Sequence, residues 1–145
     1  MRLLLQRVTS ASVMVADREI SRIGRGLLVL VGIEDGDDRA KVDKAVAKLF
    51  NLRCFEDADG RMNLSIAEVN GDVLLVSQFT LAASLTKGRR PSFIRAARPE
   101  IAEPLVEALA AGLHARGVPV ATGEFGAHMA VSLVNDGPVT FVLDL

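Results

Sequence analysis

Hydrophobic and polar residues form several short stretches along the chain that predict β-strands. Residues 1–16 alternate in part, and the turn at 16–19 leads into a second short strand that ends near Gly24. Residues 26–33 (GLLVLVGI) are a continuous apolar run, which predicts a central strand covered on both faces, and 73–79 predict another buried strand. Alternation returns in the last part of the chain, over 119–122, 129–134 and 139–143.

A first helix is predicted after the central apolar strand. Asp37 or Asp38 can cap its N-terminus, because a short carboxylate accepts the hydrogen bonds of unpaired amides there. Apolar residues then recur at helical spacing and define the buried face: Val42, Ala45, Val46, Leu49 and Phe50.

A second helix is predicted in the last third of the chain and ends at Gly117. Its apolar face consists of Ile101, Leu105, Val106, Leu109 and Leu113. Pro99 suits a first helical turn, but Pro104 follows five residues later and lacks the N–H that a helix interior needs. We therefore expect the helix to begin nearer Glu103.

Strands outnumber helices in this pattern, and the connections between them are typical of hairpins. We predict an α+β fold in which a largely antiparallel β-sheet or barrel has two helices packed outside it. No repeat, low-complexity tract or linker divides the sequence, so residues 1–145 are expected to form a single domain.

Composition excludes several classes of protein. With 145 residues, 50% hydrophobic and 24% charged, the chain is typical of a folded domain that needs neither disulfide nor metal. Cys54 is the single cysteine and His114 and His128 are the two histidines, so we expect no disulfide, no metal site and no cofactor. The apolar run at 27–31 is too short to cross a bilayer, and no signal-peptide cleavage site follows the N-terminal residues. A cytoplasmic protein without a membrane partner is expected.

The distribution of charge is more informative than the net charge of −1. Between residues 85 and 99 the chain has no acidic residue and five cations, namely Lys87, Arg89, Arg90, Arg95 and Arg98. Such a segment can bind phosphates with an affinity that depends on salt concentration. A solvated basic loop without a ligand explains the same pattern, and charge alone does not choose between the two.

The common catalytic signatures are absent from the sequence, which has no Gly-x-Ser-x-Gly elbow, P-loop or nucleotide fingerprint. Two other segments carry candidate chemistry. Ser77-Gln78-Phe79-Thr80-Leu81 follows a buried strand, where side chains and free backbone amides can line a pocket. Local hydrogen bonding at a strand end is the alternative explanation for its Ser and Thr.

Asn135-Asp136-Gly137-Pro138-Val139-Thr140 is the second segment. It lies between two alternating stretches and is rich in turn-forming residues, which favours a simple hairpin turn. Its proline also allows a cis peptide bond, and Gly137 allows another molecule to approach the backbone closely.

These two segments together resemble the motifs of the D-aminoacyl-tRNA deacylase family. The stretch 77–81 is similar to the family's Ser-Gln-Phe-Thr motif, and 135–140 is similar to its Asn-x-Gly-Pro-x-Thr motif. Further similarity lies at 1–8, 87–93 and 122–129, so the resemblance covers essentially the whole chain. It implies the family's fold and the hydrolysis of D-amino acids from tRNA.

The resemblance implies a homodimer in which Gly137 and Pro138, joined by a cis peptide bond, reach into the partner's pocket. Backbone atoms would then read the chirality of the substrate and leave no room for an L side chain. Glycine has no side chain to exclude, so the resemblance also implies cleavage of glycyl-tRNA, including tRNA-Ala mischarged with glycine.

Roles for the pocket follow from the same resemblance. The backbone amides of Phe79 and Thr80 would form an oxyanion site, while Ser77 and Gln78 would shape the substrate site. The 2′-hydroxyl of the terminal ribose of tRNA would assist the attack on the ester. The Thr80 hydroxyl is a less favoured nucleophile, because no base stands near it in the sequence.

The remaining assignments concern the nucleic acid. Phe125 and Met129 are expected to contact the terminal adenine, with plain core packing as the alternative. Lys87, Arg89 and Arg90 are expected to contact phosphates of the acceptor stem of the aminoacyl-tRNA.

Three other functions stay open on sequence grounds. A related deacylase with relaxed chirality, having a trans bond before Pro138, would also cleave some L-aminoacyl-tRNAs. A non-catalytic RNA-binding module would bind tRNA whether or not it is charged. A general esterase would cleave simple esters, although the sequence shows no pairing of a nucleophile with a base.

Overall fold

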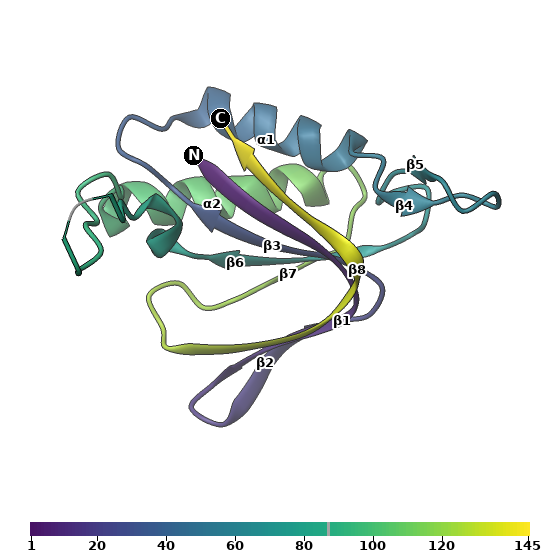
Figure 1. Ribbon diagram of the computed structural model, residues 1–145, viewed down its shortest axis with the longest axis horizontal. Helices are drawn as coiled ribbons and strands as arrows, with labels where there is room; N and C mark the ends of the chain where they lie inside the picture. Colours follow the sequence, from purple (N-terminus) through teal and green to yellow (C-terminus); the bar gives the residue numbers. More distant parts are fainter. Residues whose placement is uncertain (87) are drawn as a thin grey trace.

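The computed structural model describes residues 1–86 and 88–145 and contains a mixed six-stranded sheet with two α-helices on one face (Figure 1). Along the chain the elements are β1 (Arg2–Val15), β2 (Arg18–Ile23), β3 (Gly26–Gly32), α1 (Arg39–Asn51), β4 (Phe55–Glu56), β5 (Met62–Leu64), β6 (Asp72–Ser77), the 3-10 helix η1 (Phe79–Ala82), α2 (Pro99–His114), β7 (Val120–Thr122) and β8 (Met129–Asp144). Strands β4 and β5 form a separate two-stranded hairpin. The predicted α+β fold with two packed helices is confirmed.

Strand β1 gives the sheet its curvature, because its two halves pair with different neighbours. The first half, Arg2 to Val8, pairs with β3, and the second half, Ala11 to Val15, pairs with β2. Strand β8 pairs antiparallel with β1 along nearly its whole length. Figure 1 shows β1 and β8 bending together away from the helices, so the sheet curls into a partly closed barrel.

The connections differ from the expected hairpins at two places. Strands β3 and β6 are parallel, and so are β6 and β7, with a helix in each connection. Parallel neighbours require such long crossovers, which the apolar pattern alone does not reveal. The carboxyl ends of β3 and β6 consequently lie side by side at one edge of the sheet.

The segment Asn135–Thr140 is not the hairpin turn that its composition favours. Strand β8 runs continuously through it, and both the part before it and the part after it pair with β1. The register shifts between Gln6 and Val8 and again between Val8 and Ser10. The turn-forming residues therefore make an irregularity within one long strand, where a bulge redirects the backbone.

Both helices begin at identifiable residues, one as expected and one earlier. Asp38 caps α1, because its Oδ1 accepts the backbone N–H of Lys41 at 3.0 Å. The expectation that the second helix begins near Glu103 is wrong, since α2 starts at Pro99 and includes Pro104. Burial of one face of α2 outweighs the single hydrogen bond that Pro104 cannot donate.

Two apolar clusters lie on opposite sides of the curved sheet. The larger one fills the space between the sheet and the helices and includes Leu5, Val29, Leu49, Leu75 and Leu109. The smaller one lies on the other face and includes Val8, Val13, Ile23, Leu28 and Val76. This confirms that the central strands β3 and β6 are covered on both faces.

Candidate active site

A cavity lies at the carboxyl ends of β3 and β6, beside the first turns of α2. Its volume is ≈ 530 Å³, and its walls come from the end of β6, the segment before α2, α2 itself and the connection between β7 and β8. Five of the predicted site residues meet there: Ser77, Gln78, Phe79, Phe125 and Met129. Pockets that bind ligands commonly form at such a place, where parallel strands end.

One wall is formed by Ser77, Gln78 and Phe79 at the end of β6, and Thr80, which follows them, is not a lining residue. The Gln78 N–H donates to the Val31 carbonyl at 2.7 Å, which fixes the point where the chain leaves the sheet. Phe79 and Thr80 then begin the short helix η1, so their amides have no preceding helical carbonyl. In the described part of the chain neither amide donates to a backbone acceptor. The Thr80 side chain accepts a hydrogen bond from the Gln78 amide group.

The opposite wall comes from the connection between β7 and β8. Phe125 and Met129 are half-buried on the cavity wall, and each also packs against one of the two apolar clusters. A Cβ on Gly123 would lie 2.6 Å from the Met129 sulfur, so a larger residue there would require the Met129 side chain to shift. Gly126, with φ at +75°, makes the turn between Phe125 and Met129. The exposed His128 also borders the cavity.

Gly137 and Pro138 lie in the bulge of β8 and are both exposed. Neither is among the described residues that line the cavity of this chain. The peptide bond between them is cis. The Asn135 side-chain amide donates to the carbonyls of Arg7, at 2.9 Å, and Val139, at 3.0 Å. A Cβ on Gly137 would lie 2.1 Å from Asn135 Oδ1, so the bulge needs glycine at this position.

The Arg7 side chain supports this bulge through hydrogen bonds and ion pairs. Arg7 was not among the site residues predicted from the sequence. Its guanidinium is buried and donates from Nε to the Asp136 carbonyl at 3.0 Å and from Nη1 to the Cys54 carbonyl at 2.8 Å. It also forms ion pairs with the carboxylates of Asp136, at 3.0 Å, and Glu56, at 3.2 Å. An arginine inside a strand next to apolar residues is the signal that was available, because a buried guanidinium needs such partners.

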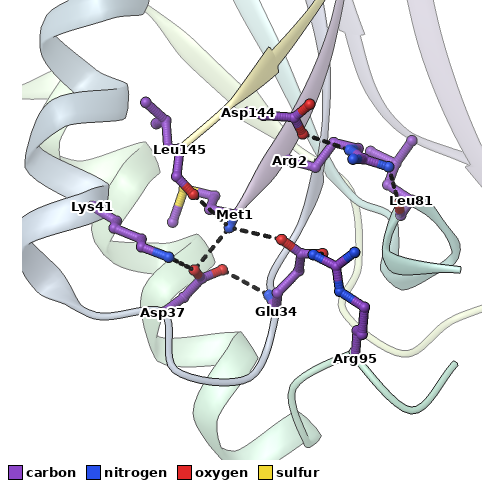
Figure 2. A network of polar contacts seen from close by, with 9 residues as sticks. All are labelled: Met1, Arg2, Glu34, Asp37, Lys41, Leu81, Arg95, Asp144 and Leu145. Carbon is purple, nitrogen blue, oxygen red and sulfur yellow. Dashed lines mark hydrogen bonds and ion pairs between the residues drawn. The ribbon is translucent and has the colours of Figure 1, made fainter. Parts of the chain in front are cut away.

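A charged network joins the start of β1 to the loop that follows β3 (Figure 2). The Met1 ammonium donates to the fully buried Asp37 carboxylate at 2.8 Å and to Glu34 at 3.2 Å. Lys41 also donates to Asp37, at 2.7 Å. Burial by itself would raise the pKa of Asp37, but the hydrogen bonds from Lys41, Met1 and the Glu34 amide together hold it below its ordinary value.

Glu34 extends this network to the cavity. Its carboxylate forms an ion pair of 2.8 Å with Arg95, which Figure 2 shows facing it from the segment before α2. The Asp35 N–H donates to the Arg95 carbonyl at 2.8 Å, and the Ala97 N–H donates to the Ile33 carbonyl at 3.0 Å. Because Ile33 and Ala97 both line the cavity, these contacts fix one of its walls.

Three other arginines of the 85–99 segment differ from Arg95. Arg89, Arg90 and Arg98 are exposed, and no ion pair is found for them in residues 1–86 and 88–145. Lys87, which was expected to act with Arg89 and Arg90, lies outside the described residues. In the described part of the 85–99 segment, Arg95 therefore has a partner within the fold, whereas the other three arginines face solvent.

Within the described residues, no three His, Cys, Asp or Glu side chains gather closely enough to hold a metal ion. None of the described helices is both long and apolar enough to traverse a lipid bilayer. Burial raises the pKa of the Cys54 thiol, so this side chain is not an activated nucleophile.

Comparison with known proteins decides the family. A model of the D-Tyr-tRNA(Tyr) deacylase family matches residues 4–144. The chain belongs to this deacylase family. Two of its relatives are D-aminoacyl-tRNA deacylases. The one from Thermomicrobium roseum is 58% identical over 99% of this chain and 94% of its own, and the one from Azotobacter vinelandii is 56% identical over 99% of each.

Solved structures have the same fold as this deacylase-family chain. The c-Myc DNA Unwinding Element Binding Protein superposes with a TM-score of 0.95 and 40% identity, covering 100% of this chain and 99% of the other. A probable eukaryotic D-amino acid tRNA deacylase superposes with a TM-score of 0.84, covering 99% and 98% of the two chains. Its identity of 23% supports the fold alone.

Proposed function

We propose that the protein hydrolyses the ester bond of D-aminoacyl-tRNA and releases the free D-amino acid and tRNA. One observation carries this proposal: a single cavity brings Ser77, Gln78 and Phe79 from the end of β6 to face Phe125 and Met129. Both groups belong to stretches that match the deacylase family, and the family match spans 4–144. It also supports residues 1–145 as one deacylase domain.

The free amides of Phe79 and Thr80 support an oxyanion site. Two neighbouring N–H groups without backbone acceptors can bind the negative charge that develops on the carbonyl oxygen of an ester during attack. The 2′-hydroxyl of the terminal ribose then assists hydrolysis from within the substrate. The Thr80 hydroxyl is disfavoured as the nucleophile because its partner is the Gln78 amide, which donates a proton and cannot remove one.

Chiral selection is assigned to Gly137 and Pro138 of a second copy of the chain. These residues are exposed and do not line the cavity of their own subunit, which is compatible with their entering the cavity of a partner in a homodimer. Asn135 and Arg7 give them the rigid support that a steric filter needs. An L side chain would meet this backbone, whereas the glycyl ester of mischarged tRNA-Ala would fit.

The nucleic acid is placed by two further sets of residues. Phe125 and Met129 are proposed to contact the terminal adenine, because both present apolar surface to the cavity while packing behind it. Arg89 and Arg90 are proposed to contact phosphates, since both are exposed and no ion pair is found for them in the described residues. Charged tRNA is a cytoplasmic substrate, and we propose the same location for the protein.

The test is the release of D-tyrosine from D-tyrosyl-tRNA by the protein and by a variant with a filled cavity. Ala127 lines the cavity, so Ala127→Phe should abolish release while the fold persists by circular dichroism. Ala111 is exposed on α2, and Ala111→Phe serves as the matched control with full activity. Equal activity in the two variants would contradict the proposed site, and tRNA binding without hydrolysis by the wild type would favour the RNA-binding module.

A further inference from the structure

An aromatic pair stands at the rim of the cavity. One member, Phe79, has a proposed role only through its backbone amide, and the other, Phe93, has no role in the ester or adenine site. The rings of Phe79 and Phe93 meet edge to face, with centroids 5.1 Å apart and an angle of 62° between their planes. Phe79 is 57% exposed and Phe93 is 39% exposed, and Phe79 also lines the cavity. We call these two side chains the rim pair. Exposed aromatic side chains in contact beside a cavity are a frequent sign of a binding surface.

The surroundings of the rim pair are apolar and positively charged. Leu85 and Ile94, on either arm of the adjoining loop, are 74% and 90% exposed. Ser84 and Ser92 pair through their backbones, which brings the two arms of this loop together next to Phe93. The same stretch contains the solvent-facing arginines Arg89, Arg90 and Arg98 and no acidic residue between 85 and 99.

Unpaired nucleotides are the ligand that fits both properties. Proteins hold single-stranded nucleic acid with aromatic side chains against the bases and cations against the phosphates. In the proposed function, the terminal adenosine and its ester occupy the cavity, so the nucleotides before them must leave over its rim. A second copy of this chain fits less well, because a symmetric contact through this surface would bring the same arginines together.

We propose that the rim pair is a stacking platform for the unpaired nucleotide that precedes the terminal adenosine of tRNA, an inference that rests on the proposed function. Phe93 is the principal contact, because its side chain has no place in the cavity wall, whereas Phe79 also serves the ester site through its backbone. The platform adds affinity for tRNA over free aminoacyl-adenosine and is indifferent to the amino acid.

The test compares two substrates that share the ester and the adenosine. D-tyrosyl-tRNA contains the preceding nucleotides, and 3′-D-tyrosyl-adenosine lacks them. Phe93→Ala removes one stacking contact, so its kcat/KM on the tRNA should be about five- to a hundredfold lower than that of the wild type, mainly through a higher KM. Its kcat/KM on the adenosine ester should equal that of the wild type. Phe93→Trp keeps an aromatic face and should stay near the wild type on both.

A control variant and a binding measurement complete the test. Met62 is 49% exposed on the β4–β5 hairpin, which lies at the far end of the molecule from the 84–98 segment (Figure 1). Met62→Ala should therefore change kcat/KM on neither substrate. Uncharged tRNA should bind Phe93→Ala more weakly than wild type when its 3′ end is intact, and equally when its unpaired 3′ nucleotides have been removed.

Several results would overturn the platform. An equal loss on both substrates would mean that Phe93 supports the cavity, and no loss on either, with unchanged binding of intact tRNA, would mean that no nucleotide contacts it. Loss of self-association by Phe93→Ala in light scattering would reassign the rim pair to an interface between copies. If the wild type cleaves neither ester but binds intact tRNA in a way that depends on Phe93, the platform stands and the proposed hydrolysis fails.

Discussion

Arg7 and Asp136 are 129 positions apart in the chain, yet Arg7 Nε lies 3.0 Å from the Asp136 carbonyl oxygen. The contact crosses from β1 to the bulge in β8, directly before Gly137 and Pro138. Asn135 completes it from the other side by donating to the Arg7 carbonyl at 2.9 Å. The exposed Gly-Pro pair is therefore supported by a charge-assisted hydrogen bond from the buried Arg7 guanidinium and by a second hydrogen bond from the Asn135 amide, which suits a part of the backbone that has to hold its shape.

Replacing Arg7 should weaken both the fold and the proposed chiral filter. Arg7→Ala leaves the Cys54 and Asp136 carbonyls without their donor and should lower the free energy of unfolding by about 3 kcal/mol. Arg7→Lys keeps the charge but cannot reach the same set of acceptors, so an intermediate loss is expected. Urea unfolding measures the first effect, and the ratio of D- to L-tyrosyl-tRNA hydrolysis, which should fall, measures the second.

Arg22 provides the control for Arg7, because its ion pair with Glu19 is exposed. Arg22→Ala should leave the free energy of unfolding close to that of the wild type, because solvent screens an exposed ion pair. A stable Arg7→Ala protein with unchanged D/L selectivity would show that the bulge does not need Arg7.

Adding one methyl group at Gly137 should disturb the bulge. The new Cβ would lie 2.1 Å from Asn135 Oδ1, so Asn135 must move and lose its bonds to the Arg7 and Val139 carbonyls. Gly137→Ala should therefore lower the free energy of unfolding by about 2 kcal/mol. Gly24 has open space around it, and Gly24→Ala is the matched control for a glycine change. Equal melting temperatures of the two variants would refute the crowding at Gly137.

The stability of the protein should depend on Asp37 in acid. Its pKa is lower in the folded chain than its ordinary value of 3.8, so the ionised carboxylate stabilises the fold at any pH above that value. This stabilisation is lost as the pH falls through the lowered pKa of the folded state. At pH 7, Asp37→Asn leaves the Met1 and Lys41 cations without their buried partner and should cost about 3 kcal/mol.

The measurement for Asp37 is denaturant unfolding at a series of pH values. The wild type should lose stability steeply in acid, and Asp37→Asn should show a flatter profile over the same range. Asp43→Asn, which removes an exposed partner of Arg39 on α1, should follow the wild type. Parallel profiles for wild type and Asp37→Asn would contradict the assignment.

Reversing the charge of Arg89 and Arg90 should weaken the binding of tRNA and reduce its dependence on salt. Each phosphate contact that is lost should lower the slope of log K against log salt by about 0.7 to 0.9. Arg53 and Arg61 are exposed near the β4–β5 hairpin, so Arg53→Glu with Arg61→Glu changes the net charge equally and should leave the slope intact. An unchanged slope in Arg89→Glu with Arg90→Glu would remove these residues from the tRNA site.

The sequence predicts best what depends on local patterns. The apolar runs of β3 and β6 and the cap at Asp38 follow from spacing and side-chain chemistry within a few residues. Strand partners do not, because a parallel and an antiparallel neighbour present the same apolar pattern. The segment at Asn135 has the composition of a turn, and its pairing with the distant strand β1, together with the bond from Asn135 to the Arg7 carbonyl, cannot be read from the local pattern.

The candidate site also combines residues that a local pattern predicts with residues that it does not. The stretches with Ser77 and Phe125 carry polar or aromatic motifs, and the structure brings them together in one cavity. Small apolar residues of the remaining wall, such as Ala97 and Ala102, have no chemistry that marks them in a sequence. Their place depends on the Arg95–Glu34 ion pair and on the early start of α2 at Pro99.

The most direct test of the proposed function is the hydrolysis of one tRNA charged in parallel with D-tyrosine, L-tyrosine or glycine. Rapid loss of the D-tyrosyl and glycyl esters, with the L-tyrosyl ester spared, is the predicted result. Comparable loss of the L-tyrosyl ester would contradict selection by Gly137 and Pro138, and survival of all three esters would contradict deacylation itself.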